Sequence, residues 1–259
     1  MEGSAGVMAL VLGQTVAGAA ALLWLTPLWN EVKRGYFKLS GAILAVLAFG
    51  WWRSAAAGVV GGNAAGTWAV RLALASTLIV AGWTVLFFAR RETAARWMGL
   101  AGVPVAIAGV VAMAGTARQA EPVALFQLFA GAAFLGAVLD GLLLGHWYLT
   151  DRGLSRGPIN RYTTVLLAAV VLEAAAVLSA GFGRVEASSQ FNPLLTAGAL
   201  APWIALGMVG TTALIAVLVK AALAGTRASA VQSATGFFYL AVVTAFTAEV
   251  AVKVRFLPR

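Results

Sequence analysis

The sequence predicts an all-α, polytopic integral membrane protein: a bundle of about eight transmembrane helices with no soluble domain. Hydrophobic residues make up 61% of the 259 residues and charged residues only 10%, whereas soluble domains average about 45–50% and about 25%. Eight apolar stretches approach the roughly 20 residues that cross about 30 Å of hydrocarbon. They are continuously apolar and do not alternate as barrel strands do. We therefore expect residues 1–259 to form one helical bundle domain.

The expected spans cover residues 6–29, 39–53, 71–89, 97–116, 122–149, 162–181, 195–218 and 231–252. The first lacks a basic leading region and is too long for a cleaved signal, so it is expected to stay as a membrane helix. The second is short, and an extension through Val60 would place Arg53 inside it. Pro104 and Pro202 fall inside the fourth and seventh spans, where each predicts a kink. We find no convincing sequence repeat between the two halves of the chain.

The positions of the basic residues predict the orientation. Most of the 18 lysines and arginines lie in the odd-numbered loops, and such charge marks the cytoplasmic side of a membrane. These residues are Lys33, Arg34, Lys38, Arg90, Arg91, Arg96, Arg152, Arg156, Arg161, Lys220 and Arg227. We therefore expect both termini outside, in a bacterial inner membrane. The net charge of +9 is expected to serve topology and lipid headgroup contact, with no nucleic-acid partner.

Composition also restricts the cofactors. There is no cysteine and a single histidine, so this chain cannot by itself ligate an iron–sulfur cluster or a bis-histidine haem. We expect no haem and no metal from this chain alone. Aromatic residues gather at the span ends. We interpret them first as belts at the headgroup level, and alternatively as contacts with a quinone or pigment. Gly141 and Gly145 form a small-residue pattern that predicts close helix packing, inside the bundle or against a partner.

Two acids interrupt the apolar stretches deeply enough to suggest chemistry. Asp140 lies about 12 Å, and Glu173 about 17 Å, from the cytoplasmic ends of two spans that form a hairpin. A carboxylate at such depth costs a few kcal/mol unless it is protonated, paired or hydrated. Both are therefore expected to face the bundle interior. They would either handle protons, ions or quinone, or simply hydrogen-bond neighbouring helices and fix the bundle geometry.

Other polar residues complete the candidate set. His146 is expected near the cytoplasmic headgroup level. Its side chain would donate to a quinone carbonyl, take up protons at the membrane surface, or simply bond to the loop backbone. Arg161, across the hairpin, is expected to pair with Asp151 or lie near His146. Glu249 precedes Lys253 by one helical turn, which predicts an ordinary ion pair, with Arg53 or Arg71 as other partners. Gln14 and Gln127 hint at a polar interior.

These features favour a membrane subunit of a respiratory or photosynthetic electron-transfer complex. It would be quinone-associated, without its own metal cofactor, and bound to lipid and to other membrane or peripheral redox subunits. A path through His146, Asp140 and Glu173, with a cavity opening near His146, would serve the quinone. In helix number and orientation the chain resembles the eight-helix, haem-free quinol-reactive anchors of bacterial oxidoreductases. No functional residue of those anchors is assigned to a position in this chain. The alternatives are a small proton-coupled transporter and a purely structural or assembly subunit.

Overall fold

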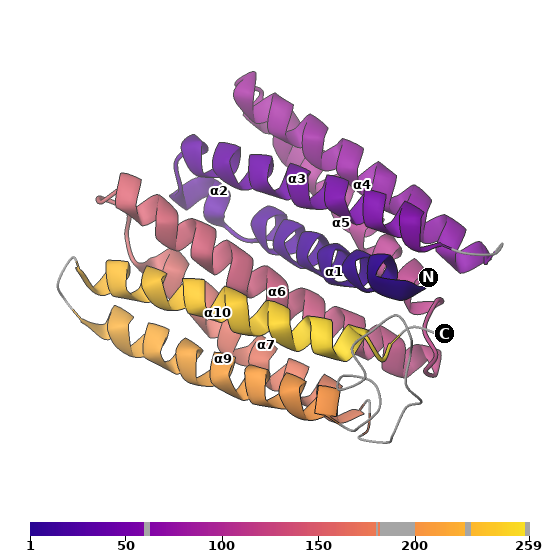
Figure 1. Ribbon diagram of the computed structural model, residues 1–259. Coiled ribbons are helices and arrows are strands. Elements are labelled where there is room, and N and C mark those ends of the chain that lie inside the picture. The colour runs from indigo at the N-terminus through magenta and orange to yellow at the C-terminus, as the bar shows by residue number, and fades with distance from the viewer. Residues whose placement is uncertain (60–62, 180, 182–199, 226–228, 257–259) are drawn as a thin grey trace.

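The computed structural model describes residues 1–59, 63–179, 181, 200–225 and 229–256. Eight helices in this part of the chain are long and apolar enough to cross a membrane (Figure 1). They are α1 (Gly3–Leu25), α3 (Arg34–Gly58), α4 (Ala64–Phe88), α5 (Glu92–Ala114), α6 (Glu121–Thr150), α7 (Gly157–Ser179), α9 (Leu200–Ala224) and α10 (Ser229–Lys253). A short helix, α2 (Leu28–Glu31), follows α1. The predicted helical membrane bundle is confirmed.

Several helices extend beyond the apolar stretches that predicted them. The second span, expected at residues 39–53 or with an extension through Val60, is the 25-residue helix α3. It ends at Gly58 and holds Arg53 inside it, as the extended alternative predicted. Hydropathy marks only the part of a helix in hydrocarbon, while hydrogen bonding continues the helix into the headgroup region. Pro104 lies inside α5. Pro202 lies near the start of the described part of α9. Residues 195–199 of the seventh predicted span lie outside the described residues.

The helices form two four-helix halves that share one packing order. In the first half, α1 packs against α3 and α5, and α4 packs between those two. In the second half, α6 packs against α7 and α10, and α9 packs between those two. The halves meet chiefly where α1 packs against α6, at the centre of the molecule (Figure 1). The architecture therefore repeats although the sequence gives no recognisable repeat.

Glycines make the contact between α1 and α6 possible. A Cβ atom added at Gly18 would lie 1.7 Å from the carbonyl oxygen of Ala132, and one at Gly136 would lie 2.4 Å from the carbonyl carbon of Gly18. Backbone therefore meets backbone, as small residues allow in membrane bundles. Gly141 and Gly145 instead make room for the side chains of Phe238 and Thr235 of α10, so the predicted close packing occurs inside this bundle.

Several tryptophans, two of them at predicted span ends, are buried in the core of the first half. Trp24 and Trp51 are 2% and 0% exposed. Trp24 lies beside Trp83, with ring centroids 5.8 Å apart, and Trp83 packs against Phe87 at 4.8 Å. Trp24 and Trp51 therefore face the core of the bundle and not lipid. The local sequence does not show that these tryptophans are buried while Trp97 is exposed.

Candidate functional site

A fully buried ion pair lies in the second half, near the end of α10 where both chain termini gather. The Lys253 Nζ lies 3.1 Å from a Glu249 carboxylate oxygen, and both side chains are 0% exposed. The helical spacing predicted this pair, but as an ordinary contact near the outer end of the last span. The alternative partners Arg53 and Arg71 are exposed and lie over the rings of Trp52 and Trp68.

Glu173 of α7 brings a second carboxyl to this ion pair. Its side chain is buried and interacts with both the Glu249 carboxyl and the Lys253 ammonium. As expected, the structure buries Glu173 inside the bundle and away from lipid. One ammonium balances only one carboxylate, so ionisation of both acids would leave a net negative charge in the low-dielectric interior. The three groups together are neutral when the two carboxyls share one proton.

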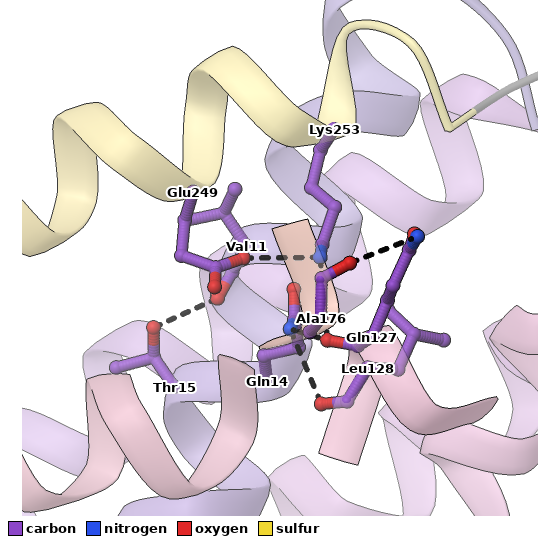
Figure 2. Close-up of polar contacts among 8 residues, drawn as sticks. All are labelled: Val11, Gln14, Thr15, Gln127, Leu128, Ala176, Glu249 and Lys253. Atoms are coloured by element: carbon purple, nitrogen blue, oxygen red, sulfur yellow. Dashed lines mark hydrogen bonds and ion pairs between the residues drawn. The ribbon is translucent and has the colours of Figure 1, made fainter. Parts of the chain in front are cut away.

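Two glutamines connect these charges to the central helices (Figure 2). The Gln14 Nε2 of α1 donates to the carbonyl oxygens of Gln127 and Leu128, at 3.3 and 3.2 Å. The Gln127 carbonyl also accepts from Lys253 Nζ at 3.5 Å, and Gln127 Nε2 donates to the Ala176 carbonyl at 3.5 Å. We call Gln14, Gln127, Glu173, Glu249 and Lys253 the Lys253 cluster. It draws on α1, α6, α7 and α10, and so includes both halves.

Gly131 of α6 provides the space for this cluster. A Cβ atom there would lie 1.9 Å from Gln14 Nε2 and 2.5 Å from Glu249 Oε1. The amide and the carboxyl therefore occupy the volume that a larger residue would fill. Sequence reasoning noted both glutamines but missed Gly131 and the central place of Lys253. The position of Glu249 inside a membrane span could have pointed to this cluster, because an acid in hydrocarbon is costly unless it has polar partners.

Asp140 lies apart from the Lys253 cluster. It is 0% exposed and interacts with Tyr162 of α7 and Tyr36 of α3. Along α6, Gln127 and Asp140 are separated by roughly 20 Å at about 1.5 Å per residue. Asp140 thus faces the interior as expected, but the structure does not bring it together with Glu173. The two acids belong to separate polar groups near opposite ends of the bundle.

The two remaining candidates lie at the end of the bundle opposite the termini. His146 is exposed, and its Nδ1 lies 3.4 Å from the Tyr239 hydroxyl. The expected pairing of Arg161 with Asp151 is wrong: Arg161 pairs with Glu31 at 2.5 Å, and Asp151 pairs with Lys33 at 3.0 Å. The unforeseen helix α2 carries Glu31, and so supplies a partner that hairpin geometry alone did not predict.

A cavity of about 200 Å³ opens between the α6–α7 turn and the start of α10. Its lining comprises Tyr148, Leu149, Arg152, Leu154, Arg156, Val231 and Gln232. It therefore lies beside the hairpin at the expected end, although His146 is not among the lining residues. A second cavity, of about 230 Å³, lies at the opposite end and includes Arg118 and Arg255. Burial, and then the Arg118 guanidinium, lower the pKa of Arg255.

Among the described residues, no three histidine, aspartate or glutamate side chains are grouped to hold a metal ion. In the Lys253 cluster two carboxyls face one ammonium, so the ammonium balances one carboxylate and the second carboxyl is the group suited to holding a proton. The chain matches no protein-family model, no curated protein and no solved structure.

Proposed function

We propose that this chain handles protons inside the bilayer as the quinone-associated membrane subunit of an electron-transfer complex. The Lys253 cluster carries the proposal, because three ionisable side chains with 0–1% exposure meet there. Ionisable residues within membrane segments are costly, and they typically mark ion pathways and proton relays. Redox subunits would supply the electrons, since this chain has no cysteine and only one histidine.

The chemistry follows from the charge balance of the cluster. Lys253 stabilises one carboxylate, while the other carboxyl keeps a proton. The proton can transfer from Glu173 to Glu249 without a change in net charge, so the transfer avoids the main electrostatic cost of moving charge through hydrocarbon. Oxidation or reduction of a quinone moves protons together with electrons, and a buried carboxyl pair can accept or supply such a proton.

The cavity beside Tyr148 is the candidate quinone position. Among its lining residues, Arg152 carries a guanidinium and Gln232 an amide, and both groups can donate to a quinone carbonyl. His146 lies on the same end of α6, as the sequence-based path requires. Extraction of lipids from the natively purified complex is expected to yield a stoichiometric quinone together with redox subunits. Purification of the chain alone and without quinone would contradict this part of the proposal.

Replacement of the two cluster acids tests the proton role. Glu173→Gln and Glu249→Gln keep the shape but remove a titratable group, so each is expected to slow quinone-linked turnover of the complex by about 10²-fold or more. Steady-state turnover and subunit stoichiometry would be measured together. Glu121→Gln, at the exposed start of α6, is the matched control. Full turnover in both cluster variants would exclude a proton role for these acids.

Both termini are proposed to lie outside a bacterial inner membrane. The two termini lie at one end of the bundle (Figure 1), as an even number of spans requires. The loops at the other end hold most of the basic residues, and positive charge favours the cytoplasmic side. A reporter fused after Arg96 is expected to be cytoplasmic, and one fused after Arg259 periplasmic. Reports of one and the same compartment would contradict the arrangement.

A proton-coupled carrier is the second candidate, and the repeated architecture favours it. Many carriers are built from two structural repeats with the coupling site between them, and the Lys253 cluster includes Gln14 of the first half and Glu249 of the second. Proton uptake into liposomes that contain the purified chain alone, driven by a candidate solute, would favour the carrier. A third alternative is an assembly subunit, favoured if the acid substitutions change nothing.

A further inference from the structure

We propose that a second, independent proton site lies between the two halves: Asp140 holds a proton, and bound water joins its carboxyl to the hydroxyls of Tyr36, Ser40 and Tyr162. We call these four residues the Asp140 group. Nothing in the Lys253 cluster requires this site, because the two lie roughly 20 Å apart along α6. The inference rests on the placement of the four side chains and does not depend on the electron-transfer proposal.

The four side chains reach one place from three helices. Tyr36 and Ser40 lie one turn apart on α3, Asp140 lies on α6, and Tyr162 lies near the start of α7. All four are 0–2% exposed. The carboxyl interacts with the Tyr162 and Tyr36 hydroxyls, and Tyr36 interacts with Ser40. The first half thus contributes two hydroxyls, and the second half contributes a carboxyl and a third hydroxyl.

These buried polar atoms are unsatisfied by other described residues. Both Asp140 carboxyl oxygens, both tyrosine hydroxyls and the Ser40 hydroxyl have no partner in hydrogen-bond geometry. A buried polar group without a partner is costly, and native structures normally satisfy such groups, often with ordered water. Five oxygen atoms that face one another without direct bonds fit bridging water, because water both donates and accepts.

Because no positive charge in the described part of the chain faces Asp140, its carboxyl is expected to bind a proton and stay neutral. The titratable groups that interact with it are Tyr36 from α3 and Tyr162 from α7. No ion pair among the described residues includes Asp140. An ionised carboxylate here would be an uncompensated charge deep in the bundle, whereas the protonated acid is neutral and can donate to water.

Thr26 extends the Asp140 group toward the end of the bundle opposite the termini. It caps the C-terminal end of α1, it interacts with Tyr162, and its hydroxyl oxygen is likewise buried without a partner among the described residues. A proton that arrives at this end can pass along hydroxyls and water, since each oxygen accepts a proton from one neighbour as it gives its own to the next. The last transfer is to an Asp140 carboxylate oxygen, and no electron moves in any step.

Infrared spectroscopy of the purified chain tests the site without any activity assay. The wild type at neutral pH is expected to show a protonated-carboxyl C=O band that Asp140→Asn removes. In D₂O this band should shift as the proton exchanges, and Tyr162→Phe should slow the shift by on the order of tenfold. Tyr148→Phe is the matched control, because the Tyr148 hydroxyl donates to the Ser155 carbonyl outside the group.

Three outcomes decide the proposal. Loss of the band in Asp140→Asn, with slowed exchange in Tyr162→Phe only, supports it. A wild type and an Asp140→Asn variant with the same protonated-carboxyl bands would show that Asp140 is ionised, which overturns it. So would a band that sodium chloride removes and choline chloride does not, because that result indicates a monovalent cation site. Thermal unfolding of each variant shows whether it is folded, and Asp140→Glu offers a conservative replacement if Asp140→Asn fails to fold.

Discussion

Gly18→Leu and Gly136→Leu are each expected to prevent the two halves from packing together. At both positions even a Cβ atom would overlap backbone atoms of the other helix, at 1.7 and 2.4 Å, and no side-chain rotation can relieve a clash with backbone. Overpacking usually costs about 1–3 kcal/mol, and separation of two helix backbones should exceed that range. The measurement is the yield of monodisperse protein in detergent and its thermal unfolding.

Gly207 on α9 provides the control for this prediction. A Cβ atom there meets nothing within 4 Å, so Gly207→Leu keeps the same change of volume without the same contact. It is expected to leave yield and unfolding temperature nearly unchanged. Normal folding of Gly18→Leu and Gly136→Leu would mean that α1 and α6 do not approach each other as described.

Lys253→Met is expected to destabilise the protein by about 3–5 kcal/mol, the usual cost of removing one partner from a buried ion pair. The substitution leaves Glu173 and Glu249 together without a positive charge, and both are buried. Methionine fills a similar volume, so the effect reports charge and hydrogen bonding and only weakly reports packing. Unfolding by denaturant in mixed micelles would give the free energy.

A double substitution separates the charge effect from other causes. Lys253→Met combined with Glu249→Gln removes the unpaired carboxylate, so it is expected to recover much of the lost stability, and the cycle measures the coupling between the two residues. Lys220→Met, at an exposed position on α9, should be close to neutral. Equal losses for Lys253→Met and Lys220→Met would contradict the importance of the buried pair.

Hydrophobicity alone predicts the class of this fold, because eight long apolar stretches admit few other structures. It does not predict which side of a helix faces which neighbour, since helices such as α1 and α6 are apolar on nearly every side. Asp140 and Glu173 therefore looked like members of one path from their depths, yet they lie in separate groups. For the same reason, the sequence could not distinguish the buried Trp24 from the exposed Trp97.

The candidate site was only partly predictable for a related reason. The spacing of Glu249 and Lys253 predicts their ion pair because both lie on one helix. The contact of that pair with Gln14 and Gly131 joins segments far apart in the chain, and nothing local to any of them encodes it. Glu31 was missed as the partner of Arg161 because the four-residue helix α2 has no hydropathy signal of its own.

The central place of α1 sets an order of events during synthesis. This helix is made before its neighbours α6 and α10, which follow only after long stretches of further chain. Until then Gln14 and the bare backbone around Gly18 have no final partner, so the insertion machinery or lipid must hold them in the interval. Lys253 emerges near the end and completes the charged cluster. The charged cluster is therefore complete only once α10 has been made, although α1 by then already has α3, α5 and α6 to pack against.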